Sequence, residues 1–185
     1  TIYEAKQFLV VSHDKARQIL NNGFQIKFNV VGNYVNEEVF FPSTIVENNV
    51  FRIITVGAYV YIKDTQTIFE MLKLVDCEDY SDEIEFIYAG FDGWGGNNTD
   101  KIKEILQEFN FKKIKVRLIP LADRTEIAEL LRNSNLFVLS SISEGMPVSV
   151  MEALASGLPV CTTQCGGVDE LINEYKGPIV FSWSK

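Results

Sequence analysis

Three short and almost wholly apolar runs, FRIITVG, EFIYAG and LFVLSS, limit most strongly what this chain can fold into. Strands that are buried on both faces have this composition, and helices bury both faces of a parallel sheet. Amphipathic stretches with helical spacing lie between such runs, at 64–75, 99–109 and 123–133. Strands that alternate with helices are typical of βαβ units with right-handed crossovers. We therefore predict an α/β fold with a doubly wound parallel sheet.

The runs belong to a longer series of predicted strands. These are 8–12, 27–31, 51–56, 84–89, 115–119, 136–140, 160–163 and 179–181. Residues 1–48 hold only two of them, one short helical stretch and a turn-rich connector, which are too few elements for a complete sheet. We predict that 1–48 is the tail of a preceding domain and a linker, and that 49–185 forms the main domain.

Polar and small residues mark the expected starts of three helices. Thr99 and Asp123 are predicted N-caps, because their side-chain oxygens can accept from the free N–H groups of a first turn. Gly167 is predicted to begin a later helix, with Asp169 and Glu170 in the first turn, where negative charge is favourable.

The composition excludes several classes of protein. With 17 basic and 25 acidic residues the formal charge is −8, so no strong positive field attracts nucleic acid or anionic membrane non-specifically. No apolar run has the length of a membrane span, and no signal peptide is recognisable. Cys77, Cys161 and Cys165 lack a second ligand pair, and His13 is the only histidine, so we predict buried free thiols and no metal site.

Residues 144–157, EGMPVSVMEALASG, combine an apolar helix with two carboxylates. Pro147 suits the first helical position, because its missing N–H would be unpaired there, and Gly157 suits the end of the helix. Glu152 is the only charge within this helix, and a lone buried carboxylate costs several kcal/mol unless a partner satisfies it. Helical side chains tilt toward the N-terminus, so Glu152 is expected to point back toward Glu144.

Two interpretations of these glutamates remain open from spacing alone. In the first, both carboxylates face one cleft, Gly145 lets a ligand approach the backbone, and the free N–H groups of the helix start favour an anion. Carboxylates near hydroxyls and N–H groups near phosphates together describe a nucleotide-sugar. In the second, Glu152 pairs with a lysine or arginine, and Glu144 is a solvated loop residue.

The E-x7-E spacing within EGMPVSVMEALASGLPV, followed by CGGVDELI, resembles the C-terminal, donor-binding domain of the retaining GT-B glycosyltransferases of group 1, also called family 4. The likeness covers nearly the whole chain. NVVGNYVNEEVFFPS is similar to the family's interdomain stretch, and FRIITVG with the following lysine is similar to the first donor-domain strand and its loop. The resemblance implies the Rossmann-like donor half of a two-domain enzyme, with the acceptor domain before it and closing helices expected after Lys185.

The resemblance also implies roles for individual residues. Glu144 would contact hydroxyls of the donor sugar at the catalytic centre, and Glu152 would bind the ribose hydroxyls of the nucleotide. Lys63 would bind the diphosphate as a cation, in the loop that Gly57 begins. The other implied donor-binding positions lie in the two loops around the motif: Gly145, Met146, Pro147, Val148, Gly166 and Gly167.

One position departs from the family pattern. Where the family usually has an arginine directly after the glycine of the first strand, this chain has Ala58 after Gly57. One of two usual cations for the diphosphate is therefore absent. Arg124, which follows the strand ending at Pro120, is a candidate to replace it.

The function implied by the resemblance is transfer of a sugar from a nucleoside diphosphate to an acceptor hydroxyl, with retained anomeric configuration, in glycan or polysaccharide biosynthesis. No metal and no cofactor are implied, because the nucleotide-sugar is a substrate. A preceding domain would hold the glycan or lipid-linked acceptor, so residues 1–185 alone are expected to be catalytically silent. The implied location is cytoplasmic, with peripheral membrane contact through that domain as an option. A non-catalytic nucleotide-binding module and a nucleotide-sugar epimerase of related architecture are the alternatives.

Overall fold

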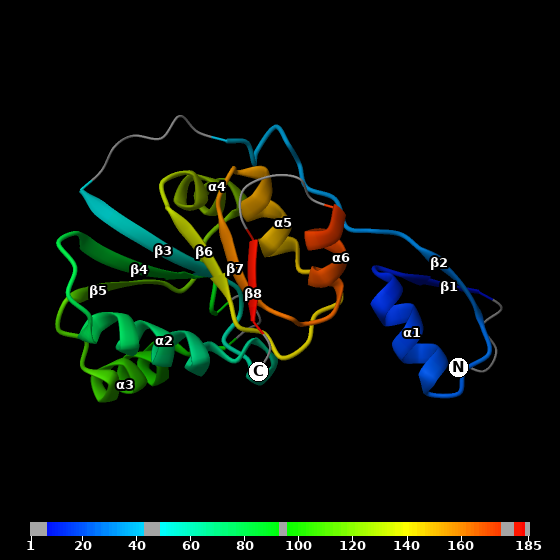
Figure 1. Ribbon diagram of the computed structural model, residues 1–185, viewed down its shortest axis with the longest axis horizontal. Helices are drawn as coiled ribbons and strands as arrows, with labels where there is room; N and C mark the ends of the chain where they lie inside the picture. Colours follow the sequence, from blue (N-terminus) through cyan, green and yellow to red (C-terminus); the bar gives the residue numbers. More distant parts are fainter. Residues whose placement is uncertain (1–6, 43–48, 93–95, 175–179, 184–185) are drawn as a thin grey trace.

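A computed structural model describes residues 7–42, 49–92, 96–174 and 180–183. Six parallel strands form the main sheet, in the order β5-β4-β3-β6-β7-β8 (Figure 1). Their bounds are β3 Val50–Val56, β4 Glu83–Ala89, β5 Ile114–Ile119, β6 Leu136–Leu139, β7 Val160–Thr163 and β8 Val180–Trp183. The predicted α/β fold with a doubly wound parallel sheet is confirmed.

Helices cover the two faces of this sheet. Helices α2 (Thr65–Cys77) and α3 (Thr99–Phe109) pack over one face, around Phe69, Leu72 and Phe86. Helices α4 (Arg124–Arg132) and α5 (Val148–Ala155) pack over the other, together with α6 (Gly167–Glu174). Each face therefore has its own apolar core, which is why the strands between them are apolar on both sides.

Two predicted helix starts differ from the structure. Asn98, not Thr99, is the N-cap of α3, because the Asp92 carboxylate accepts from the Asn98 N–H at 2.7 Å and from the Thr99 hydroxyl at 3.2 Å. Pro147 is the N-cap of α5 and not its first helical residue, since its ψ of 113° is extended. Asp123 caps α4 as predicted, in a capping box with Glu126.

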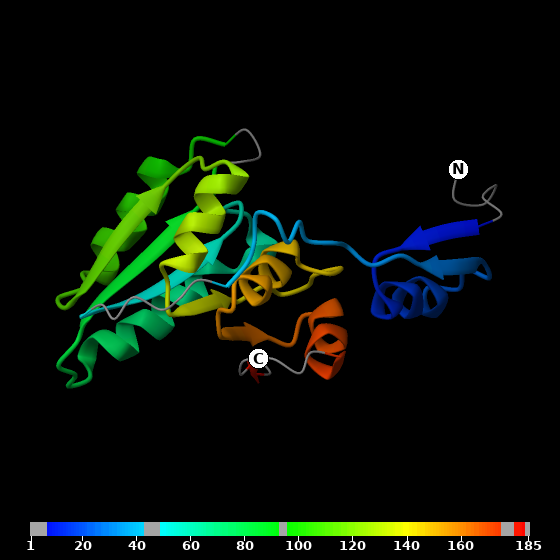
Figure 2. The ribbon, with the colours of Figure 1, turned by 90° about the horizontal axis from the view of Figure 1, so that it is seen from above.

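The described part of residues 1–48 forms a small unit of its own. Strands β1 (Gln7–Val10) and β2 (Lys27–Val30) pair in parallel across helix α1 (His13–Asn21), apart from the six-stranded sheet. Figure 2 shows this N-terminal unit to one side of the main sheet, with the chain crossing from β2 to the sheet. The predicted domain boundary adjoins 43–48, which lie outside the described residues, so the division stays a prediction.

The order of the strands creates a crevice between β3 and β6. The chain runs outward through β3, β4 and β5, and then returns to place β6 on the other side of β3. The helices that follow these two strands, α2 and α5, therefore lie on opposite faces of the sheet. Ligands of open α/β sheets bind at the carboxyl edge, at such a switch point.

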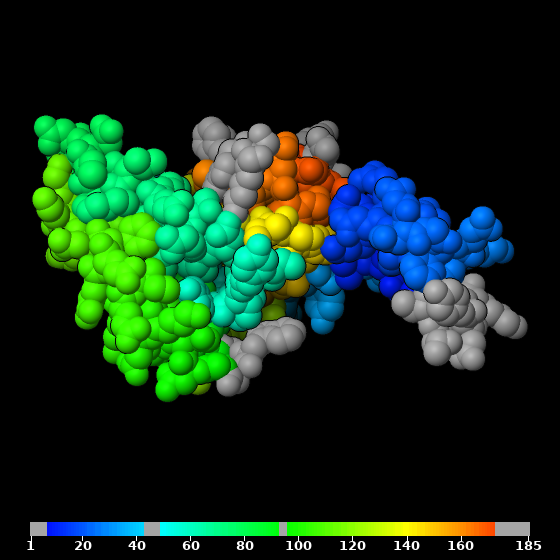
Figure 3. Space-filling view, turned by 90° about the horizontal axis from the view of Figure 1, so that it is seen from below, coloured from blue at the N-terminus to red at the C-terminus, as the bar shows by residue number. Residues whose placement is uncertain are grey.

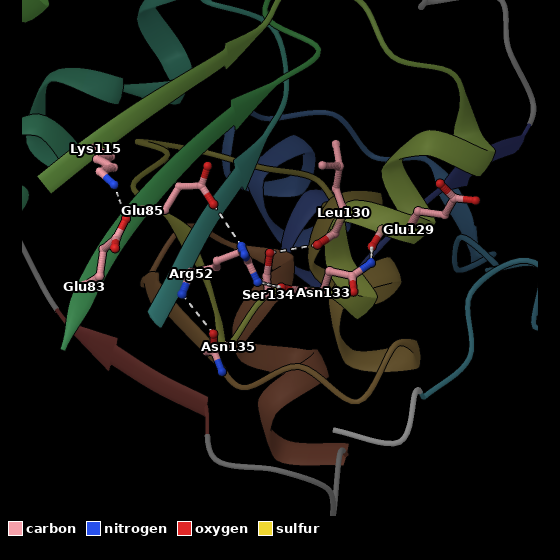
Figure 4. A network of polar contacts seen from close by, with 9 residues as sticks. All are labelled: Arg52, Glu83, Glu85, Lys115, Glu129, Leu130, Asn133, Ser134 and Asn135. Atoms are coloured by element: carbon pink, nitrogen blue, oxygen red, sulfur yellow. Dashed lines mark hydrogen bonds and ion pairs between the residues drawn. The ribbon is translucent and has the colours of Figure 1, made fainter. Parts of the chain in front are cut away.

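At the opposite edge of the sheet, near the amino ends of the strands, charged and amide side chains pair with one another. The Arg52 guanidinium donates to Glu85 at 2.8 Å, and its backbone N–H donates to the Asn135 amide oxygen at 2.8 Å (Figure 4). Lys115 pairs with Glu83 in the same group. These contacts join β3 to both its neighbours, so we interpret this network as structural.

Within the described residues, no helix has the length and apolar character of a membrane span.

Candidate functional site

Lys63 and Glu144 meet at the switch point between β3 and β6. The Lys63 ammonium lies 2.6 Å from the Glu144 carboxylate, and the side chains are 23% and 14% exposed. The Ser141 hydroxyl donates to the same carboxylate oxygen at 2.7 Å. Glu144 is therefore not a solvated loop residue, and Lys63 is not a free surface lysine.

The end of β6 fixes the loop that carries Lys63. The Ser140 hydroxyl lies 3.0 Å from the Lys63 carbonyl and 2.7 Å from the Asp64 carbonyl, and Ile142 N–H donates to the Ile62 carbonyl at 2.8 Å. Asp64 has φ +44°, a left-handed conformation that costs about 1–2 kcal/mol for most residues other than glycine. These bonds hold the loop in a conformation that places Lys63 toward Glu144.

Glu152 lies in the second turn of α5 and is buried, with a side chain that is 8% exposed. The Arg124 guanidinium lies 2.8 Å from its carboxylate. Burial raises the pKa of Glu152, and the Arg124 charge opposes that rise. The pairing of Glu152 with an arginine, one of the two interpretations of the sequence, is thus observed. The partner is the residue predicted as the replacement cation for the diphosphate.

The amino end of α5 has unused hydrogen-bond donors. No side chain caps this helix, and Pro147 has no N–H. Within the described part of the chain, the N–H groups of Gly145, Met146 and Val148 have no acceptor. This end can therefore accept an anion, as the helix dipole also favours.

The glycine pair 166–167 packs against the loop that carries Glu144. Gly166 has φ +94°, and a Cβ on Gly167 would lie 1.8 Å from the Gly145 carbonyl oxygen. Glu144 N–H donates to the Cys165 carbonyl at 2.7 Å. Close packing of two loops explains both glycines here, whereas contact of this turn with a sugar stays a prediction.

Gly57 and Ala58 lie beside Lys63 at the end of β3. Gly57 has φ +146°, and a Cβ there would lie 3.6 Å from the Lys63 Cε. Ala58 brings no charge to the phosphate region expected from the sequence, and Arg124 is engaged with Glu152. Lys63 is the predicted phosphate cation that the structure places at the crevice.

The N-terminal unit contacts the same loops. The Glu170 carboxylate of α6 accepts from the N–H groups of His13 and Asp14 at 3.0 and 2.7 Å, and so caps α1. The Lys15 ammonium donates to the Ser143 hydroxyl at 3.4 Å. Figure 3 shows the unit in blue against the segment after β6 in yellow. The N-terminal unit therefore packs beside the carboxyl edge of the main sheet, against α6 and the loop after β6.

Two hollows in the described residues lie away from these side chains. One of about 600 Å³ lies between α4 and strands β3–β5, and one of about 610 Å³ lies between α3 and β5. Neither is lined by Lys63, Glu144 or Glu152, and the crevice beside Lys63 measures about 10 Å³. A ligand of these residues would thus lie along the open edge of the sheet. Among the described residues, no group of three or more His, Cys, Asp or Glu side chains could hold a metal ion. Cys165 is buried, but Cys77 is exposed and Cys161 is partly exposed, so the predicted burial of all three thiols is wrong.

Sequence reasoning missed three contributors to the site. Ser141, which no motif in the sequence singles out, donates its hydroxyl to Glu144 and orients it. Phe40 lies under Arg124, with the guanidinium carbon 5.2 Å from the ring centroid. Glu170 was interpreted only through the dipole of its own helix. No local pattern reveals these partners, because each is distant in sequence or depends on loop geometry.

Comparison with known proteins supplies the family. The family model of "Glycosyl transferases group 1" matches residues 36–182. A 58-residue stretch, 31% of this chain and 15% of the relative, is 47% identical to N,N'-diacetylbacillosaminyl-diphospho-undecaprenol alpha-1,3-N-acetylgalactosaminyltransferase of Campylobacter jejuni. Over 93% of this chain and 38% of the relative, it is 22% identical to a subunit of the phosphatidylinositol N-acetylglucosaminyltransferase of Arabidopsis thaliana.

The fold is similar to that of solved glycosyltransferase structures. Anabaena Alr3699/HepE in complex with UDP-glucose superposes with a TM-score of 0.75 at 14% identity, over 96% of this chain and 50% of that one. The chain thus spans 15% and 38% of the two curated relatives and half of the solved protein. A likeness at this identity concerns the fold alone.

Proposed function

The chain belongs to the glycosyl transferases of group 1, and from that premise we propose that its described part binds the nucleotide-sugar donor of a retaining glycosyltransferase. The donor would be a nucleoside diphosphate sugar, and the reaction would pass the sugar to an acceptor hydroxyl without a metal ion. Relatives that act in glycan synthesis support a role in glycan or polysaccharide biosynthesis.

The observation that carries the proposal is the position of the two ion pairs. Lys63–Glu144 and Arg124–Glu152 involve both glutamates of the E-x7-E motif, and Lys63 and Glu144 come from the two loops of the switch point. Structural ion pairs require no such position, whereas a nucleotide-sugar needs acceptors for two sets of hydroxyls and donors for a diphosphate.

The proposed chemistry follows from charge. A departing diphosphate gains negative charge, which Lys63 and the N–H groups of Gly145, Met146 and Val148 would stabilise. These donors are fixed before the reaction, so they need little reorganisation. Glu144 would hold the sugar hydroxyls, and Glu152 would hold the ribose. No cofactor takes part in this scheme.

The acceptor is proposed to bind on the side of the N-terminal unit. The Campylobacter relative is named for an undecaprenyl diphosphate acceptor and the Arabidopsis one for phosphatidylinositol, so a lipid-linked acceptor is proposed here. Transfer needs that acceptor held against the anomeric carbon, and positioning supplies much of the rate. We therefore propose that residues 1–185 alone bind donor without acceptor-dependent turnover. Because the proposed acceptor is linked to a lipid, we also propose a cytoplasmic location with peripheral contact at a membrane.

A second candidate is a nucleotide-binding module without catalysis. The observation that favours it is Ala58, which leaves Lys63 as the cation at the crevice where the family usually has two. Acceptor-dependent release of nucleoside diphosphate by the full-length protein would decide for the enzyme.

Calorimetric titration of residues 1–185 with UDP, GDP, ADP, CDP and dTDP tests the donor proposal. We expect one or more to bind, and Glu152→Gln to weaken that binding by about 1.5–3 kcal/mol, the contribution of a hydrogen bond to a charged group. Glu129→Gln, an exposed change on α4, is the control. Absence of binding by all five, or affinity within twofold of wild type in Glu152→Gln, would overturn the proposal.

A further inference from the structure

Glu152 is a buried carboxylate with an incomplete set of partners. Its side chain is 8% exposed, and among the described residues its carboxylate forms an ion pair with Arg124 alone. A carboxylate can accept about four hydrogen bonds, so one guanidinium leaves acceptor capacity unused. A group in this state carries spare acceptors at a place where water is scarce, which is what a site for ligand hydroxyls requires.

Arg124 contacts both a carboxylate and an aromatic ring, although its side chain is 61% exposed. It is the first residue of α4, directly after the N-cap Asp123, which forms a capping box with Glu126. Its guanidinium carbon lies 5.2 Å from the centre of the Phe40 ring, and Phe40 is 1% exposed. A stacked guanidinium loses little freedom when it bonds a carboxylate. The helix start and the ring thus fix the direction from which Arg124 reaches Glu152.

The other charges near this pair are already engaged. The Asp123 carboxylate accepts from the N–H groups of Thr125 and Glu126, and the Glu126 carboxylate accepts from the Asp123 N–H. Across the motif, Lys63 pairs with Glu144. Among the described residues, Arg124 is therefore the countercharge on which Glu152 depends.

We propose that Arg124 is a positioning residue for the nucleoside: it pairs with one oxygen of the Glu152 carboxylate, supplies its countercharge and leaves the remaining acceptor capacity for ribose hydroxyls. The inference rests on the proposed function. This role differs from the expectation that Arg124 replaces the missing arginine at the diphosphate. The Arg124 guanidinium instead faces Glu152, the carboxylate proposed to bind the nucleoside. Phe40, from the connector between the N-terminal unit and the sheet, supports it from below.

The test compares UDP binding by Arg124→Gln and by wild type between pH 5 and pH 8. Burial raises the pKa of Glu152 and Arg124 opposes this, so loss of the guanidinium raises that pKa further. A protonated Glu152 is a poorer acceptor for ribose hydroxyls. We expect at least fivefold weaker binding at pH 7, and a loss of affinity on acidification that begins at higher pH than in wild type. Arg124→Lys should restore part of both.

Arg132→Gln is the matched control, because Arg132 is also on α4, with its guanidinium carbon 4.6 Å from the centre of the Phe41 ring. Arg132→Gln should leave the pH profile of UDP binding unchanged. Because protonation of UDP affects both variants equally, a difference between their profiles comes from the protein. In a Glu152→Gln background, Arg124→Gln should no longer shift the profile. Tighter binding by Arg124→Gln, or an unshifted profile, would overturn the inference while the donor proposal stands. Failure of wild type to bind any of the five diphosphates would instead overturn the donor proposal.

Discussion

The two glutamates of the E-x7-E motif are both paired with a cation, yet their surroundings differ. Glu144 and Lys63 lie on two loops, and both side chains are partly exposed, at 14% and 23%. Glu152 lies on a helix and is 8% exposed, whereas its partner Arg124 is 61% exposed. The first pair can exchange bonds with a ligand that enters the crevice. The second pair holds a buried carboxylate. This contrast is the reason for our proposal that the first pair binds the sugar and the diphosphate and the second binds the nucleoside.

Asp76 shows what a carboxylate that serves stability alone looks like in this fold. Burial would raise its pKa, but the N–H groups of Lys112, Lys113 and Ile114, together with Lys73, outweigh burial and lower it. Asp76 is therefore better stabilised as an anion in the folded chain than in water. Glu152 shows the opposite shift, since burial raises its pKa. The surroundings of Glu152 therefore favour its anion less than those of Asp76 favour the Asp76 anion.

The largest effect is expected from Gly167→Ala, which displaces the loop of Glu144 and leaves Glu152 in place. The new Cβ would lie 1.8 Å from the Gly145 carbonyl, so the loop with Glu144 must shift, at a cost of about 3 kcal/mol or more. Thermal unfolding measures the loss. Gly32→Ala is the control, because its Cβ would meet only the Met146 sulfur at 3.7 Å. Equal stability of the two variants would show that this loop packing is wrong.

The next effect sharpens the contrast between Asp76 and Glu152. Asp76→Asn should destabilise the chain by about 2–3 kcal/mol at pH 7, because bonds to a charged group are lost. Because the folded pKa of Asp76 is lowered, that stability is present above the unfolded pKa and disappears as the pH falls through the folded pKa.

Glu152→Gln should cost little stability at pH 7. Its folded pKa is raised, so the wild type gains stability relative to this variant as the pH falls from the raised value toward the unfolded one. Urea unfolding at several pH values measures both variants. A large loss at pH 7 for Glu152→Gln would mean that this carboxylate is structural.

A smaller effect is expected from Ala58→Arg, which adds charge on the Lys63 side only. If Ala58 leaves a cation position open, UDP should bind about fivefold more tightly, equivalent to about 1 kcal/mol, while uridine binding stays the same. Calorimetry with both ligands measures this, and Ala58→Gln controls for side-chain size. Unchanged UDP affinity would indicate a different path for the phosphates.

Much of the fold could be predicted from the sequence, because burial on both faces leaves apolar runs that are local in the chain. The predicted strand 160–163 coincides with β7, and the others in the main sheet lie within two residues of their observed bounds. Thr99 was wrong as a cap because Asp92, seven residues earlier, takes the bonds of that helix start. Caps that come from a preceding loop leave no fixed spacing.

The site could be predicted only in part. Helical spacing predicted that Glu152 points back toward Glu144, and the family resemblance, not spacing, singled out Lys63. Which cation meets which carboxylate depends on loop conformations such as the left-handed Asp64, and no short pattern encodes it. The support of Arg124 by Phe40, 84 positions away in the chain, was likewise out of reach of local patterns.

The most direct test compares uridine with UDP in Lys63→Met and Glu152→Gln, by calorimetric titration. If the chain binds another of the five diphosphates and not UDP, that diphosphate and its nucleoside are used in place of UDP and uridine. The account predicts that Glu152→Gln weakens both ligands by the same factor, because its contact is to the ribose. Lys63→Met should weaken UDP by about tenfold, equivalent to about 1.4 kcal/mol, and leave uridine within twofold of wild type. Equal losses of both ligands in Lys63→Met, or loss of UDP but not of uridine in Glu152→Gln, would contradict the division of the site into a diphosphate side and a nucleoside side.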